Sequence, residues 1–136
     1  MKKQYTLSKK YDFDFVALAI NSHSKSYSLC WGLNKELGLD FEKNKDHKIG
    51  GEMFFSRYST VNSEGESYQL LSNRSKQGYL ISSHKKIDYF LIINKTCWQK
   101  IKSKILKKLK NISEILLVFE LALNKTLHAN RLIIND

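Results

Sequence analysis

The densest hydrophobic pattern in the chain is the run 87–93, in which Asp88 is the only charged residue. The run is rich in β-branched and aromatic residues and is too short to cross a membrane. Such a run predicts a β-strand that is buried on both faces. Alternation along this strand would place Asp88 with Phe90 and Ile92, opposite Ile87, Tyr89, Leu91 and Ile93.

The pattern ahead of this run predicts one strand followed by one helix. Apolar residues through 12–20 predict the strand, residues 21–24 offer helix N-caps, and the period becomes helical over 25–37. Gly38 predicts the end of the helix. We expect the helix to bury one broad face, made of Tyr27, Leu29, Cys30, Trp31, Leu33 and Leu37.

Residues 40–51 are polar, carry mixed charges and predict a connection that ends at two glycines. Beyond it, short apolar segments alternate with turn-forming residues. This spacing predicts an antiparallel meander. Its expected strands are 53–61, 67–72, 79–83 and 87–94, with turns at 62–65 and 73–78.

The C-terminal part predicts a second helix and a further strand. Thr96 and Gln99 fit a capping box that opens a helix over 97–110. The apolar run 115–123 predicts a strand, although its length leaves a helix open. The tail ends in an apolar segment, 132–134, that we expect to dock on the core. At the other end, residues 1–11 are polar and basic and predict a frayed end or an edge strand.

The order of these elements is strand, helix, antiparallel meander, helix, strand. It predicts an α+β fold with a single mostly antiparallel sheet and two main helices packed on one face. A length of 136 residues fits one domain over 1–136. An apolar fraction of 42% with 12% aromatic residues supplies an ordinary globular core and argues against intrinsic disorder.

The chain is basic, with a formal net charge of +10. A positively charged chain attracts polyanions, so the charge indicates RNA or an acidic protein as a partner. Only three of the 23 basic residues are arginines, and the chain also has no proline. That composition is typical of AT-rich codon usage, so the charge has two explanations. The lysines on the outer face of the second helix are a candidate nucleic-acid or acidic-partner surface, or simply a solvated face: Lys100, Lys104, Lys107 and Lys108.

No pattern for a metal, a cofactor or a catalytic group stands out. Cys30 and Cys97 form no CxxC and are expected to be buried free thiols. The four histidines lie far apart in sequence, and no phosphate-binding glycine loop or G-x-S-x-G is present. We therefore assign no catalytic residue, metal or cofactor. The sequence also lacks a signal-peptide pattern and an apolar run long enough to span a membrane, so a cytoplasmic location is expected.

Asp88 and the aromatic strands each allow two interpretations. A carboxylate in an apolar strand needs a partner, such as Arg57, Arg74 or a lysine, and the sequence favours a structural ion pair over a site carboxylate. Phe54–Phe55 and Tyr89–Phe90 could present a stacking platform for RNA bases. Core packing explains the same rings without a ligand, and we favour it.

The segment 81–89 resembles the signature of the IPExxxVDY family of small bacterial proteins. Ile81, Asp88 and Tyr89 match that signature, Ile87 replaces its Val, and Ser82–Ser83 stand where its Pro and Glu would be. Residues 11–15, 27–38 and 88–92 are similar to the family in the same order and spacing. The resemblance implies no assigned activity. Genes of this family often lie beside a ribonuclease III gene, which implies a link with RNA.

Three hypotheses about function follow from the sequence. The first is a non-enzymatic binding module that acts on RNA or on a protein. The second is a protein adaptor or homodimer that uses an exposed sheet edge or the tail 132–134. The third is an enzyme of unrecognised type around Asp88 and His84, which we rank below the other two.

Overall fold

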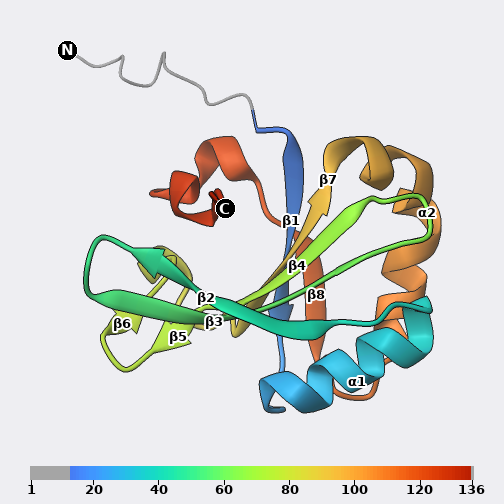
Figure 1. Ribbon diagram of the computed structural model, residues 1–136, viewed down its shortest axis with the longest axis horizontal. Helices are drawn as coiled ribbons and strands as arrows, with labels where there is room; N and C mark the ends of the chain where they lie inside the picture. The colour runs from blue at the N-terminus through green and yellow to red at the C-terminus, as the bar shows by residue number, and fades with distance from the viewer. Residues whose placement is uncertain (1–12, 136) are drawn as a thin grey trace.

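The computed structural model describes residues 13–135. The predicted N-terminal segment 1–11 lies outside this range. The helices and strands follow the order β1 (Phe15–Asn21), α1 (Ser26–Leu37), β2 (Glu42–Ile49), β3 (Met53–Val61), β4 (Ser67–Ser72), β5 (Arg74–Ser75), β6 (Gly78–Tyr79), β7 (Tyr89–Asn94), α2 (Lys95–Lys110) and β8 (Leu117–Glu120) (Figure 1).

Six of the strands form one antiparallel sheet in the order β2-β3-β4-β7-β1-β8, which confirms the predicted α+β class. The strand expected from the densest hydrophobic run, β7, lies inside this sheet between β4 and β1. The two-residue strands β5 and β6 form a separate small hairpin. The predicted strand 79–83 was therefore wrong, because the chain pairs only over Gly78–Tyr79 and then forms a 3-10 turn at Ser82–His84. The connection between β3 and β4 is short, as the meander pattern predicts, and β2 precedes β3 through another short connection that was not predicted.

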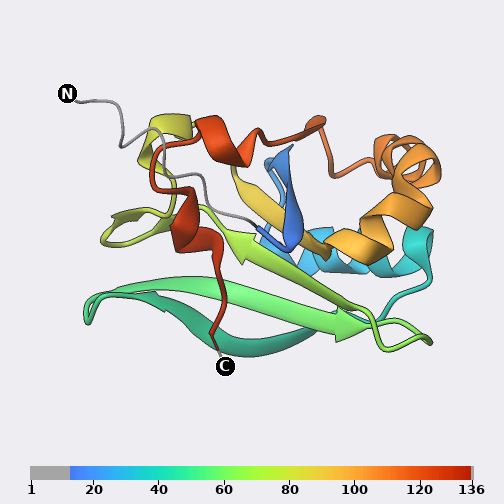
Figure 2. The same ribbon diagram turned by 90° about the horizontal axis from the view of Figure 1, so that it is seen from above.

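The sheet buries apolar side chains on both faces. On one face Leu18, Leu70 and Leu91 pack with Leu29 of α1 and Trp98 of α2. On the other face the cover is irregular chain, which comes from the 73–88 connection and from the C-terminal segment. The residues that meet there include Ala19, Phe55, Leu71, Leu80, Ile81, Phe90 and Leu132. The helices and the C-terminal segment lie on opposite sides of β1 (Figures 1 and 2).

The sequence prediction was wrong about residues 40–51, because β2 occupies most of this polar connection. The strand reads EKNKDHKI and has no run of apolar residues. It forms the edge of the sheet beside β3, with a register shift between Asn44 and His47. An edge strand needs little hydrophobic character, since one side and one face remain in water.

The prediction for α1 was right in its extent and wrong in its width. Leu29, Cys30 and Leu33 are buried, but Tyr27 and Trp31 are 64% and 63% exposed. The 112–114 turn packs closely against the helix at Gly32, where a Cβ would lie 2.9 Å from Cγ2 of Ile112. The buried face of the helix is narrower than predicted. The buried face is therefore centred between the sheet and the 112–114 turn, and the two large aromatic rings point outward.

Helix α2 confirms the second predicted helix but begins with a different cap. Oδ1 of Asn94 accepts hydrogen bonds from the backbone N–H groups of Thr96 and Cys97, at 2.9 and 3.2 Å. The Thr96–Gln99 capping box is therefore wrong, because the helix starts two residues earlier than that box requires. Neither α1 nor α2 combines the length and the hydropathy that a membrane-spanning helix requires.

The predicted strand 115–123 is shorter than its apolar run. Only Leu117–Glu120 pair with β1, as strand β8; the run is loop on either side of this strand until Leu123, which begins a short 3-10 helix. Leu116 and Leu117 are more than half exposed. The tail docks as predicted through Leu132, which is fully buried, although Ile133 beside it is 37% exposed.

Candidate functional site

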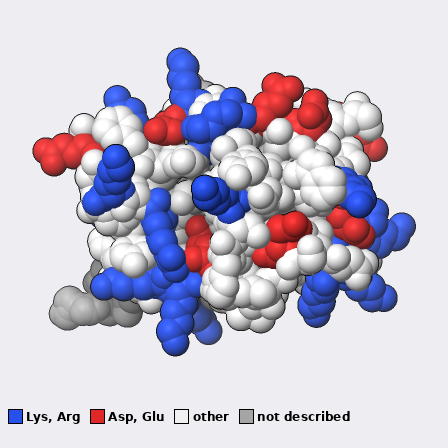
Figure 3. Space-filling model, turned by 90° about the horizontal axis from the view of Figure 1, so that it is seen from below, with Lys and Arg blue, Asp and Glu red and all other residues white. Residues whose placement is uncertain are grey.

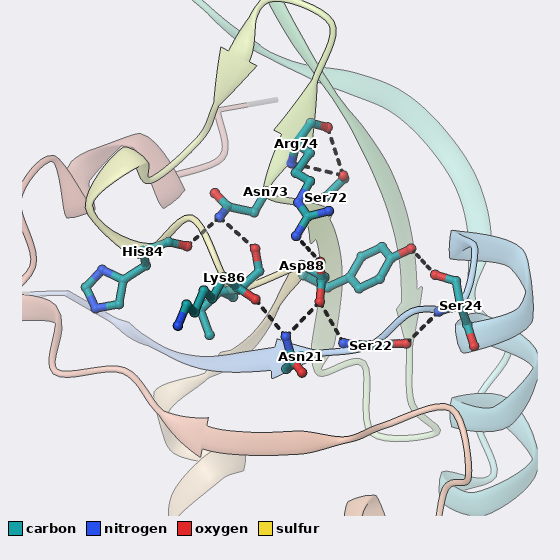
Figure 4. Close-up of polar contacts among 11 residues, drawn as sticks. Asn21, Ser22, Ser24, Ser72, Asn73, Arg74, His84, Lys86 and Asp88 are labelled. Atoms are coloured by element: carbon teal, nitrogen blue, oxygen red, sulfur yellow. Dashed lines mark hydrogen bonds and ion pairs between the residues drawn. The ribbon is translucent and has the colours of Figure 1, made fainter.

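Asp88 lies at the end of the 73–88 connection, one residue before β7, and its carboxylate has three partners (Figure 4). Oδ1 pairs with Nη2 of Arg74 at 2.7 Å. Oδ2 accepts hydrogen bonds from the Ser22 backbone N–H at 2.8 Å and from Nδ2 of Asn21 at 3.0 Å. Since the strand begins only at Tyr89, the predicted alternation was wrong for Ile87, which packs with Phe90 and Ile92.

The same group of contacts fastens the connection between β1 and α1 to the sheet. Oγ of Ser22 accepts a hydrogen bond from the Ser24 N–H at 3.1 Å. The Tyr89 hydroxyl donates to the Ser24 carbonyl at 2.6 Å. Asp88 and Tyr89 thus hold a loop that precedes them by more than sixty positions, since Tyr89 and Ser24 are 65 residues apart. Burial raises the pKa of Tyr89, so its hydroxyl stays protonated and donates this bond at neutral pH.

Asn73 organises the other half of this region, a role that its position in a predicted turn did not indicate. Its side chain is fully buried. Nδ2 donates to the carbonyls of His84 and Ile87, and Oδ1 accepts from the Ile81 N–H. Its own N–H and C=O bond to Asp88 and Leu80. The side-chain amide bonds three backbone groups and the backbone of Asn73 bonds two more, so this buried residue fixes the path of the 73–88 connection.

A hollow lies beside Asp88, and the polar groups around it bond mainly to one another. Its volume is about 360 Å³, and Ser22, His23, Ser24, Ser72, Arg74, Asp88 and Tyr89 line it. The imidazole of His84 points away from Asp88 and contacts Oγ of Ser83 (Figure 4). With its oxygens committed to Arg74 and the β1–α1 loop, Asp88 has the partners expected of a structural carboxylate. This arrangement counts against the enzyme alternative around Asp88 and His84.

The structure separates the four lysines of the candidate binding surface. Lys100 forms ion pairs with Glu64 at 2.9 Å and with Glu66 at 2.8 Å, both from the β3–β4 connection. These carboxylates raise the pKa of Lys100. Its charge is therefore already paired within the fold, and Lys100 serves to fasten α2 to the β3–β4 turn.

The other three lysines, Lys104, Lys107 and Lys108, form what we call the α2 lysine surface. All three are exposed, and among residues 13–135 none of them has a carboxylate within ion-pair distance. Lys104 and Lys108 border a shallow hollow of about 120 Å³ that also contains Leu37 and Tyr68. Elsewhere, on the side seen from below Figure 1, basic and acidic side chains are interspersed (Figure 3).

The remaining candidates are placed apart from one another or inside the core. Phe55, Tyr89 and Phe90 are buried, so these rings cannot receive RNA bases; only Phe54 of that group is exposed. Nε2 of His47 contacts the Arg131 carbonyl at 2.6 Å. Within the described chain, no three histidine, cysteine, aspartate or glutamate side chains gather as metal ligands.

Both cysteines are buried free thiols, as predicted. Burial raises the pKa of Cys30 to about 12. Burial also raises the pKa of Cys97, whose Sγ lies 3.2 Å from the Tyr68 hydroxyl. A thiol that stays protonated is a poor nucleophile and a poor metal ligand, so these residues belong to the core.

Comparison with known proteins adds no relative to this description. No family model matches the chain, and no curated protein matches it.

Proposed function

We propose that this protein is a non-enzymatic binding module that holds RNA on the α2 lysine surface. The observation that carries the proposal is the set of three exposed lysines on one helix with no acidic partner in the described chain. Lysines without partners keep their full attraction for phosphates, and each contact releases counterions from the nucleic acid. The net charge of +10 supports the same class of ligand.

The test is the salt dependence of RNA binding, measured by fluorescence anisotropy with a mixed-sequence single strand. Each phosphate contact on single-stranded RNA contributes roughly 0.7 to the slope of log affinity against log salt. Replacing Lys104, Lys107 and Lys108 by Gln should therefore lower that slope by about 2. The matched control replaces Lys76, Lys86 and Lys125 by Gln, which removes the same charge from other exposed positions.

Two results would contradict the proposal. Equal losses in the two triple variants would mean that the RNA responds to net charge alone. An absence of binding by the unaltered protein at low salt would remove RNA as the ligand. Purification from the native cell with and without nuclease then distinguishes an RNA-mediated association from a protein complex.

A protein adaptor is the second candidate function, and one observation favours it. Tyr27 and Trp31 are one helical turn apart on α1 and are each more than 60% exposed. Nζ of Lys35 lies 5.1 Å from the centre of the Trp31 ring. Exposed Trp and Tyr side chains are typical of protein-binding hot spots. Replacing Tyr27 and Trp31 by Ser should abolish nuclease-resistant co-purification if this function is correct.

We also propose that the chain is a divergent member of the IPExxxVDY family. Support comes from the roles of the matching residues. Asp88 and Tyr89 together fasten the β1–α1 loop, and Ile81 and Ile87 are buried in the core on the face of the sheet away from the helices. Ser82 and Ser83, where the chain departs from the signature, lie exposed on a single 3-10 turn. A change there leaves these structural contacts intact.

A further inference from the structure

The two edges of the sheet differ in how well they resist pairing with another strand. The β2 edge carries Lys43, Lys45 and Lys48 and has a register shift in its middle. The C-terminal segment also touches it, through His47 and the Arg131 carbonyl. Charged side chains, irregular register and a covering segment are the usual protections of an edge strand.

Strand β8, at the other edge, has weaker protection: it carries no lysine, Glu120 is its one charged residue, and no register shift interrupts its pairing between Leu117 and Glu120. Its one strand neighbour in the described part of the sheet is β1. The Leu121 N–H donates to the Ala17 carbonyl at 2.8 Å, which fixes the alternation of backbone groups along the strand. Leu117, Phe119 and Leu121 therefore direct their backbone groups toward β1, whereas Val118 and Glu120 direct theirs to the open side.

The side chains along this edge are apolar and accessible. Leu116, Leu117 and Phe119 are 57%, 56% and 37% exposed. No lysine or arginine occurs from 111 to 124, although the chain has 23 basic residues. Because the chain is positively charged, most of its surface repels a second copy. The repulsion is smallest near β8, where the local charges are Glu114 and Glu120.

We propose that β8 is a homodimer interface, in which two copies pair their β8 strands antiparallel about a two-fold axis at Phe119. In this register Val118 of each copy faces Glu120 of the other, and each pair exchanges both N–H···O bonds. Phe119 meets its own counterpart, and Leu117 faces Leu121. No two glutamates stand directly opposite each other. The two six-stranded sheets become one continuous sheet.

A second copy fits this edge because the strand is its own complement under two-fold symmetry. The outward donors and acceptors of one β8 meet the same groups of the other, and the apolar side chains on the face away from the helices align with each other. Pairing over four residues is a small interface. We therefore expect a weak dimer, with a dissociation constant of roughly 10⁻⁶ M or higher.

The first test is sedimentation velocity of the full chain over a wide concentration range. The expected result is a shift from monomer to dimer that Leu117→Lys or Phe119→Lys weakens by roughly tenfold or more, because each change places a charge at the interface twice. Val61→Lys is the matched control, since Val61 is equally apolar, 63% exposed and far along the sheet in β3. It should leave the association unchanged.

The second test is amide hydrogen exchange, which reads out the register. The N–H groups of Val118 and Glu120 should exchange rapidly in dilute protein and slowly in concentrated protein. Those of Phe119 and Leu121, which bond to β1, should be protected at both concentrations. A constant monomer mass at all concentrations would overturn the proposal. So would a dimer in which the Val118 and Glu120 amides stay unprotected, or one that Phe119→Lys leaves intact.

Discussion

Asp88 shows how much one side chain contributes to this fold. Its carboxylate joins the 73–88 connection to the loop between β1 and α1, which are brought together only in the folded chain. The Arg74 side chain of the ion pair is 56% exposed, whereas the Asp88 side chain is 10% exposed. The bonds to Asn21 and Ser22 are therefore better shielded from water than the ion pair is, and they should contribute more to stability.

Replacing Asp88 by Ala should lower the free energy of unfolding by about 1–3 kcal/mol, because the buried Ser22 N–H loses its acceptor. Urea denaturation followed by circular dichroism measures the change. Arg74→Gln is the matched variant, because it removes only the exposed partner and should cost less than about 1 kcal/mol. Equal losses would show that the ion pair, and not the loop contact, stabilises this junction.

Glu66 gives the fold a defined acid sensitivity. Hydrogen bonds from Asn62 and Lys100 lower the pKa of Glu66 to about 2. A carboxylate with a depressed pKa contributes stability above its ordinary pKa, and this contribution is lost as the pH falls from about 4.5 to about 2. Glu66→Gln should therefore flatten the decline in the urea midpoint over that interval. Glu52→Gln, at an exposed position with no ion pair in the described chain, should leave the decline as steep as before.

The two thiols should be inert in the native protein. With both cysteines buried and the pKa of Cys30 raised to about 12, a disulfide reagent at pH 8 should label neither residue until urea unfolds the chain. A Tyr27→Cys variant places a thiol on the exposed face of α1 and is the positive control. Rapid labelling of the unaltered native protein would contradict the burial described above.

At the scale of elements, the hydrophobic pattern predicted most of the helices and strands and was weakest at their ends. It located β3, β4, β7, α1 and α2, because each has a local period that matches its conformation. It missed β2, whose polar residues suit an edge, and it predicted a strand over 79–83 where only Gly78–Tyr79 pair. It also extended β8 too far and made the buried face of α1 too wide. These errors share a cause, since exposure depends on neighbours such as Ile112 that are distant in the sequence.

The start of α2 provides a direct test of one such correction. Asn94→Ala should cost about 1 kcal/mol of unfolding free energy, because the Thr96 and Cys97 N–H groups lose their acceptor. Thr96→Ala tests the capping box expected from the sequence and should change stability by much less. A larger loss for Thr96→Ala than for Asn94→Ala would restore the capping box.

At the scale of the whole molecule, the second face of the sheet is closed by chain without regular helices or long strands. Leu132 is the residue through which the C-terminal segment enters this core, where it packs in the same cluster as Phe55 and Phe90. The C-terminal segment is therefore part of the core on this face of the sheet. The tail also covers part of the β2 edge, which leaves β8 as the open edge of the described sheet.

Leu132→Ala should destabilise the protein by about 2–5 kcal/mol, the range for removing a fully buried leucine side chain. Ile133→Ala, at the partly exposed neighbouring position, should cost less than about 1.5 kcal/mol. Thermal unfolding of both variants measures the difference. A small loss for Leu132→Ala would mean that the tail is not part of the cooperative core.

Local periodicity by itself determined the α+β class, the buried strand at the centre and the two amphipathic helices, because these depend on side chains a few positions apart. The surface proposed to bind RNA was only partly predictable from the sequence. The helical pattern grouped Lys100, Lys104, Lys107 and Lys108 on one surface. In the folded chain Lys100 is paired with Glu64 and Glu66 and does not belong to that surface. The tertiary structure alone decided that pairing, the partners of Asp88, the exposure of Trp31 and the open edge at β8. Each of these depends on which distant segments meet, and no short window of sequence contains that information.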